Sequence, residues 1–113
     1  ACRNDLSLKD SMENASIDSK NKIIKMSLKN FNEASVKAFG LAKISSEALN
    51  YNLSYYNSLI KNIREKENYF GLIRKAIHVQ SYYAIISNSV SLAEFNSVDD
   101  LKNSDFIFKD EKD

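Results

Sequence analysis

Proline is absent from this chain of 113 residues, and glycine occurs only as Gly40 and Gly71. Small all-β domains normally use both residues at their turns, because proline presets one turn dihedral and glycine adopts positive φ without steric cost. Their scarcity favours a few long elements, so the sequence predicts an all-α fold. A chain of this length is expected to form one domain with a core of moderate size.

Cysteine and histidine are each present once, as Cys2 and His78. A single cysteine excludes an intrachain disulfide, and a zinc site needs several cysteine or histidine ligands. No acidic residue stands three or four positions from His78, so this side chain lacks a nearby partner for acid–base catalysis. Glycine-rich phosphate loops are also missing. The sequence therefore predicts a protein that is not an enzyme and has no catalytic residue, metal or cofactor.

Charge is unevenly distributed along the chain. Residues 18–80 hold eleven Lys and Arg against five Asp and Glu, whereas residues 81–113 hold three against seven. Lysines are spread out and arginine occurs only three times, so we do not expect a nucleic-acid partner. The simplest interpretation is an acidic end that is solvated or folds near a basic body. The alternative is a basic surface that attracts an acidic partner.

Residues 76–93 form a run of 18 residues without a charged side chain. Around this run, apolar residues recur in steps of three and four, which places them on one helical face. This spacing predicts a buried helix from about Tyr69 to Asn88, after a turn near Glu67-Asn68. Several serines and other polar residues make the run a poor membrane span. The stripe comprises Tyr69, Leu72, Ala76, Val79, Tyr83, Ile86, Val90 and Ala93.

A similar spacing runs through the first half of the chain. It predicts a first helix over about 18–49 and a second over about 53–66; the rival division is one helix through to about Lys66. Other candidate boundaries are Ser45-Ser46, which could cap a new helix, and Asn50–Asn52. Small residues at the centre of this seam would let a second helix approach closely. The seam comprises Ile24, Leu28, Phe31, Ser35, Ala38, Ala42, Ser45 and Leu49.

The predicted domain organisation has three parts. Residues 1–16 form a polar leader or tether, and residues 17–108 form an antiparallel bundle of three main helices with short terminal helices. One short helix is expected over about Val98–Asn103, where a capping pattern begins at Ser97. Residues 109–113 are expected to be a frayed acidic tail.

Tyrosines cluster in two segments that the bundle would bring together. Antiparallel second and third helices would place Tyr51, Tyr55 and Tyr56 opposite Tyr82 and Tyr83. One interpretation is aromatic packing in which each hydroxyl reaches solvent. The other is a recognition patch, because tyrosine is enriched at protein interfaces. These five residues are the predicted protein-binding residues.

The start of the chain carries a further signal. Ala1-Cys2, a polar leader, and an Asn-, Lys- and Ser-rich body without proline together resemble the small helical surface lipoproteins of spirochaetes, in composition and layout. This resemblance implies a lipid on Cys2, a location at the bacterial cell surface or outer membrane, and a partner such as a host protein. Alternatives for the Ala-Cys start are a cytoplasmic chain without its initiator Met and a residual tag.

These observations predict a non-catalytic, lipid-anchored helical module that binds another protein. Contact with a membrane would then occur only through the lipid on Cys2. The alternative is a cytosolic helical adaptor or regulator that forms a homodimer through the small residues Ser35, Ala38, Ala42 and Ser45.

Overall fold

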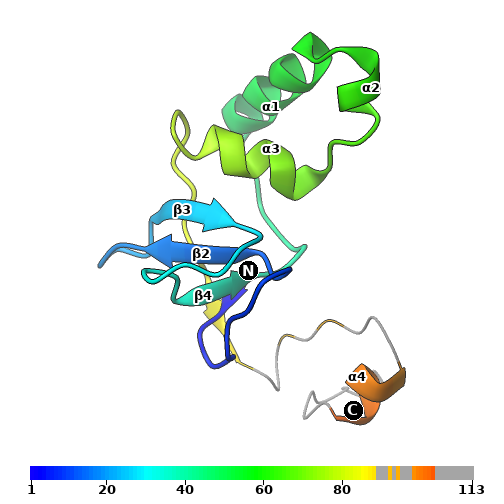
Figure 1. The fold of residues 1–113 in the computed structure, drawn as a ribbon. Helices are drawn as coiled ribbons and strands as arrows, with labels where there is room; N and C mark the ends of the chain where they lie inside the picture. The colour runs from blue at the N-terminus through cyan, green and yellow to red at the C-terminus, as the bar shows by residue number, and fades with distance from the viewer. Residues whose placement is uncertain (89–91, 93, 95–97, 104–113) are drawn as a thin grey trace, which may run out of the picture.

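The computed structural model describes residues 1–88, 92, 94 and 98–103 of the chain. It contains a five-stranded mixed sheet with a helical arm on one side (Figure 1), so the prediction of an all-α helical bundle is wrong. The elements in chain order are β1 (Cys2–Arg3), β2 (Asn14–Ile17), β3 (Ile23–Ser27), β4 (Val36–Ala38), α1 (Ser46–Ser58), α2 (Lys61–Arg64), α3 (Tyr69–Ala76), β5 (Ile86–Ser87) and α4 (Val98–Lys102).

The strand order in the sheet is β3-β2-β4-β1-β5. Strand β2 pairs antiparallel with β3 and β4, and β1 pairs antiparallel with β4 and parallel with β5. Residues 1–16, which we expected to be a leader, supply β1 and most of β2. Strand β1 lies between β4 and β5, so the first residues of the chain are part of the sheet.

Asparagine, serine and aspartate provide the turn chemistry that we assigned to glycine and proline. Ser11 has φ 72° and Asn21 has φ 64°, in the left-handed region. Asn is enriched in that region because its short polar side chain can bond locally. The Asp18 carboxylate accepts the backbone N–H groups of Lys20 and Lys22 at 2.8 and 2.9 Å, which holds the β2–β3 turn. Scarce glycine and proline therefore did not exclude a sheet.

The first two predicted helices, over residues 18–49 and 53–66, are replaced by strands and shorter helices. Residues 23–38 contain β3 and β4, and α1 begins only at Ser46, after the Ser45 hydroxyl accepts the Ala48 N–H at 3.1 Å. The expected seam is therefore not one helical face: Ala38 lies in β4, whereas Ser45 caps α1. A homodimer that involves these residues stays a prediction.

The third predicted helix is correct only in its first part. Helix α3 begins at Tyr69, as expected, with Asn68 as its N-cap, but it ends at Ala76. The chain then returns toward the sheet. Over residues 82–86 the burial of successive side chains alternates: Tyr82, Ala84 and Ile86 are covered, whereas Tyr83 and Ile85 are exposed. This alternation is the strand pattern, and it leads into β5.

The ends of the chain are described only in part. Helix α4 agrees with the short helix expected near residues 98–103. The predicted tail over 109–113 and the end of the predicted bundle domain, residues 104–108, lie outside the described residues.

The core lies where α3 covers the sheet near β3 (Figure 1). Helix α3 contributes Ile73, and Ile77 follows directly after the helix. Burial of these side chains is the main favourable term, at about 25 cal/mol for each Å² of apolar surface removed from water. The buried core residues are Cys2, Ala15, Ile23, Met26, Val36, Ala38, Ile73, Ile77 and Ala84.

Candidate protein-binding surface

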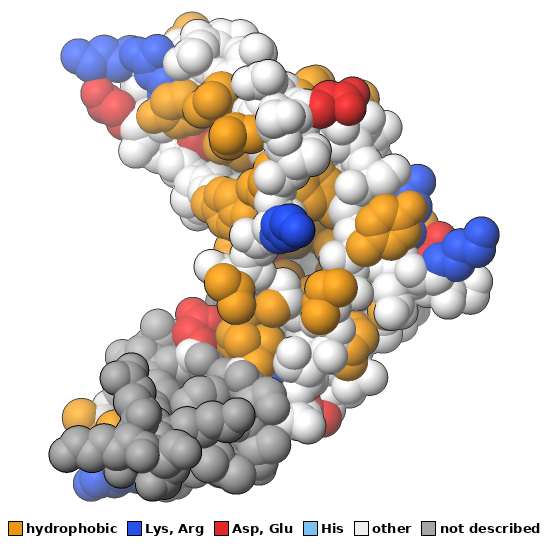
Figure 2. Space-filling model, turned by 180° about the vertical axis from the view of Figure 1, so that it is seen from behind, with side chains coloured by type: hydrophobic (Ala, Val, Ile, Leu, Met, Phe, Trp, Pro, Cys, Tyr) orange, Lys and Arg blue, Asp and Glu red, His pale blue; other side chains and the backbone are white. Residues whose placement is uncertain are grey.

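Helices α1 and α2 extend from the body and bury little of their own surface. Helix α1 buries only Ala48 and Asn52, and α2, which lies wholly within the described part of the chain, buries no residue. Four large apolar side chains of these helices and of the α2 N-cap, Ile60, are 46–63% exposed, and we call them the arm surface: Leu49, Leu53, Ile60 and Ile63. Figure 2 shows hydrophobic side chains gathered over this end of the molecule, beside basic side chains at its corner.

Local sequence explains why this end of the molecule is thinly covered. Leu49 and Leu53 are four residues apart and share one face of α1. The chain leaves α1 at Leu59, whose ψ is 145°, and Ile60 then begins a single helical turn. A helix of four residues cannot cover a neighbouring face. Ile60 and Ile63 are therefore left in solvent.

Basic groups lie beside the aromatic residues of α1. The Arg64 guanidinium lies 6.0 Å from the centre of the Tyr56 ring, and the Lys75 ammonium lies 5.3 Å from that of Tyr55. Lys75 also forms an ion pair with Glu67 at 3.2 Å. The pKa of Lys75 is raised, mainly by its hydrogen bond with Tyr55 and secondly by its hydrogen bond with Glu67. These cation–π contacts hold positive charge along the flank of the arm.

The structure brings the two tyrosine segments together at one contact that involves Asn52. Asn52 of α1 donates from its Nδ2 to the Tyr82 hydroxyl at 3.1 Å, and the Tyr82 ring packs against the core. Tyr51, Tyr55 and Tyr56 on α1 are partly buried, whereas Tyr83 is exposed. A binding role for these five tyrosines stays a prediction.

The arm surface was not among the residues predicted for binding. Leu49 and Ile63 fall on the predicted helical seam, whereas Leu53 and Ile60 were assigned to no face, so nothing in the local pattern showed that the four would stay uncovered.

Cys2, the predicted lipid-attachment residue, lies inside the core with only 2% of its surface exposed. This burial raises the pKa of the thiol, although the N-terminal ammonium acts in the opposite direction. The ammonium of Ala1 donates to the Leu41 carbonyl at 2.6 Å. Lipid attachment stays a prediction, and in the conformation described here it would require β1 to leave the sheet.

Neither a metal centre nor a membrane span is found in the part of the chain that the structure describes. Its His, Cys, Asp and Glu side chains form no group of three that could hold an ion, and His78 is exposed. None of the described helices is long and apolar enough to cross a bilayer.

Comparison with known proteins adds no relative: no protein-family model, no curated protein and no solved structure matches this chain. The resemblance to spirochaete lipoproteins therefore rests on composition and layout alone.

Proposed function

We propose that this protein is a non-catalytic module that binds another protein through the arm surface. The observation that supports this proposal is the half-exposure of Leu49, Leu53, Ile60 and Ile63 on two helices that share little of the core. Apolar side chains gathered on the surface of a small domain are typical of interaction sites.

The energetics of the arm surface favour a partner with an apolar face. Complete burial of a Leu or Ile side chain contributes about 1.5–3 kcal/mol, so covering the exposed half of all four residues gives roughly 3–6 kcal/mol. This gain must exceed the entropic cost of association, which requires further contacts around the patch. Lys61 and Arg64 on α2 would steer a partner whose rim is acidic.

The predicted location remains part of the proposal. A lipid on Cys2 would place the arm at a bacterial cell surface, where a host protein is the expected partner. Without the lipid, the same arm would act in the cytoplasm. Mass spectrometry of the protein purified from its native cells distinguishes these versions, because acylation adds the mass of the lipid to the N-terminal peptide.

Photo-crosslinking at single positions tests the arm surface. We would place benzoylphenylalanine at Leu53 or Ile63 and illuminate the protein in the presence of proteins from its natural surroundings. Both positions should give adducts with the same partner. The matched control is Ile85, an apolar residue with 69% exposure that lies beside the sheet. Equal labelling from Ile85, or no adduct from either arm position, would contradict the proposal.

A further inference from the structure

A cleft of about 670 Å³ lies beside α3 and the start of β2, and its lining includes none of the four arm-surface residues. Its walls include the apolar side chains of Met12, Phe39 and Phe70, and its polar groups include the ion pair of Glu13 with Arg74. Most small-molecule sites combine apolar walls with a few polar groups that orient the ligand. This cleft has an apolar wall of that kind, and its polar lining is more extensive, because Arg3, Lys9, Asp10, Lys37, Glu94 and Asp100 also line it.

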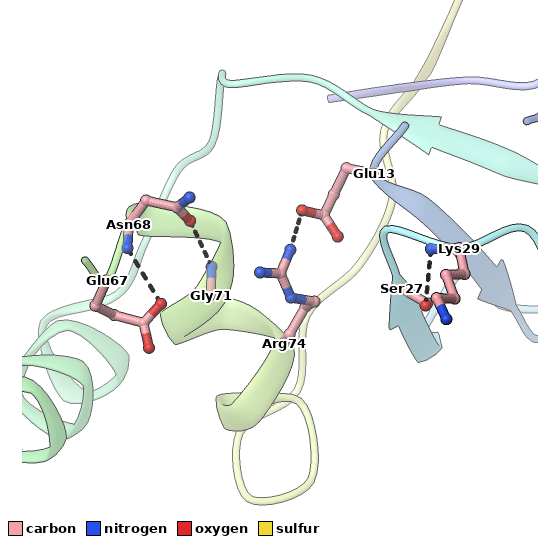
Figure 3. A network of polar contacts seen from close by, with 7 residues as sticks. All are labelled: Glu13, Ser27, Lys29, Glu67, Asn68, Gly71 and Arg74. Atoms are coloured by element: carbon pink, nitrogen blue, oxygen red, sulfur yellow. Dashed lines mark hydrogen bonds and ion pairs between the residues drawn. The ribbon is translucent and has the colours of Figure 1, made fainter. Parts of the chain in front are cut away.

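The Glu13 carboxylate is only half satisfied. Its Oε1 accepts a hydrogen bond from Nη1 of Arg74, and Figure 3 draws no contact from the second oxygen to that guanidinium. The Glu13 side chain is 5% exposed, and within the described part of the chain its buried Oε2 has no hydrogen-bond partner. Buried polar atoms are nearly always paired, and each unpaired one costs about 1–3 kcal/mol or more. Oε2 can therefore accept a further hydrogen bond.

Arg74 has N–H groups that can donate further hydrogen bonds. A guanidinium carries five N–H donors in a planar fork, and Arg74 uses its Nη1 for Glu13. Its other N–H groups make no hydrogen bond to a described residue, and the side chain is 24% exposed. The fork geometry of arginine suits a carboxylate, which can accept two of these N–H groups.

We propose that the cleft binds a free α-amino acid with an apolar side chain. Its ammonium donates to Oε2 of Glu13, its carboxylate accepts from the remaining N–H groups of Arg74, and its side chain packs against Phe70 and Met12. Among the described residues, four basic and four acidic side chains line the cleft, so a zwitterion leaves its formal charge balanced. A simple amine would add a positive charge beside Arg74, and a simple carboxylate would leave Oε2 without a donor.

Titration of the purified wild-type protein with L-leucine and L-phenylalanine, followed by ¹H–¹⁵N NMR, tests the site. Saturable shifts are expected for Met12, Glu13, Phe70 and Arg74. N-acetyl-leucine lacks the ammonium and leucinamide lacks the carboxylate, so each should bind at least about tenfold more weakly than leucine. The proposal is overturned if neither amino acid binds at about 10 mM, where ligands of millimolar affinity occupy their sites. It is also overturned if N-acetyl-leucine binds as well as leucine.

A substitution identifies the atom responsible. Glu13→Gln keeps the shape of the side chain, and its amide oxygen can still accept from Arg74, but its NH₂ group replaces the acceptor Oε2. Leucine affinity should fall at least about tenfold. The matched control is Glu67→Gln, which changes another ion-paired glutamate that does not line the cleft and should leave leucine affinity unchanged. Unchanged affinity in a folded Glu13→Gln protein overturns the proposal, and the ligand comparisons above test it independently of any variant's folding.

Discussion

Asn52 on α1 donates a hydrogen bond to the hydroxyl of Tyr82 at 3.1 Å, and this contact joins the arm to the segment that leads into β5. Asn52 is one of only two buried residues of α1. Its Oδ1 is buried and has no hydrogen-bond partner within the described residues. The attachment of the arm to the body therefore depends on few polar contacts.

Removing the hydroxyl of Tyr82 should loosen this attachment. Tyr82→Phe leaves the Asn52 amide without its partner in a buried position, so we expect a loss of about 1–2 kcal/mol in the free energy of unfolding, measured in urea. The control is Tyr83→Phe at the exposed neighbouring residue, which should change stability by less than about 0.5 kcal/mol. Equal effects of the two changes would show that the bond contributes nothing.

The Cys2 thiol should be protected from reagents in the folded protein. Burial raises its pKa, with the N-terminal ammonium acting in the opposite direction, and reagent must also reach a residue inside the sheet. We expect its reaction with 5,5′-dithiobis(2-nitrobenzoic acid) at pH 8 to be at least about 100-fold slower than in guanidinium chloride. Similar rates in the two conditions would show that β1 leaves the sheet readily, which is the condition for lipid attachment.

Arg74→Met should be strongly destabilising, because it leaves the buried Glu13 carboxylate without its countercharge. We expect a loss of about 3–5 kcal/mol in urea unfolding, and the double variant Glu13→Leu/Arg74→Met should recover most of it. The control is Lys75→Met, which breaks the more exposed pair with Glu67 and should cost less than about 1 kcal/mol. If the single and double variants have the same stability, Glu13 is not the cause of the loss.

Gly71→Ala should show coupling to Glu67. A Cβ at Gly71 would overlap the Glu67 carboxylate, which accepts the N–H of Asn68 at 3.1 Å and pairs with Lys75. In a Glu67→Ala background, Gly71→Ala should stabilise the protein by about 1 kcal/mol, because alanine is the better helix former. In the wild-type background the gain should be smaller, since Glu67 must move. Equal gains in a double-mutant cycle would exclude the clash.

Asp18 should make stability depend on pH. The backbone N–H groups of Lys22 and Lys20 lower the pKa of this carboxyl below its ordinary value of 3.8. A pKa that is lower in the folded state adds stability above the unfolded-state value, and this stability is lost as the pH falls through the folded-state pKa. Wild type should therefore exceed Asp18→Asn in Tm at neutral pH, and the difference should shrink once the pH drops below 3.8. A pH-independent difference, or an equal shrinkage for Glu33→Gln, would argue against this role.

Helix starts were the part of the fold that could be predicted from sequence. The candidate cap at Ser45-Ser46, the start at Tyr69 and the short helix near residue 98 all agree with the structure. Capping bonds join residues only two or three positions apart, as in the bond from Gly71 N–H to Asn68 Oδ1 at 2.9 Å. Such local signals remain valid whatever the rest of the chain does.

The strands were missed because one of them imitates a helical pattern. Ile23 and Met26 are both buried although they are three residues apart, which is a helical step. Ile23 pairs with Ile17 and Lys25 pairs with Ser16, so Ile24 has no partner in β2. This additional residue in β3 places the Met26 side chain on the same face of the sheet as Ile23. A β-bulge has this effect because it shifts the alternation of side chains by one position.

The sequence by itself determined where helices start, because the capping bonds that begin a helix join neighbours along the chain. Only the tertiary structure decided that Cys2 is buried, that Glu13 meets Arg74, and that Leu53 and Ile63 stay exposed. Glu13 and Arg74 are 61 residues apart. Helices α1 and α2 are exposed because the helix that packs against β3 in the described part of the chain is α3. Contacts at such separations depend on how strands and helices pack, and no local pattern records them.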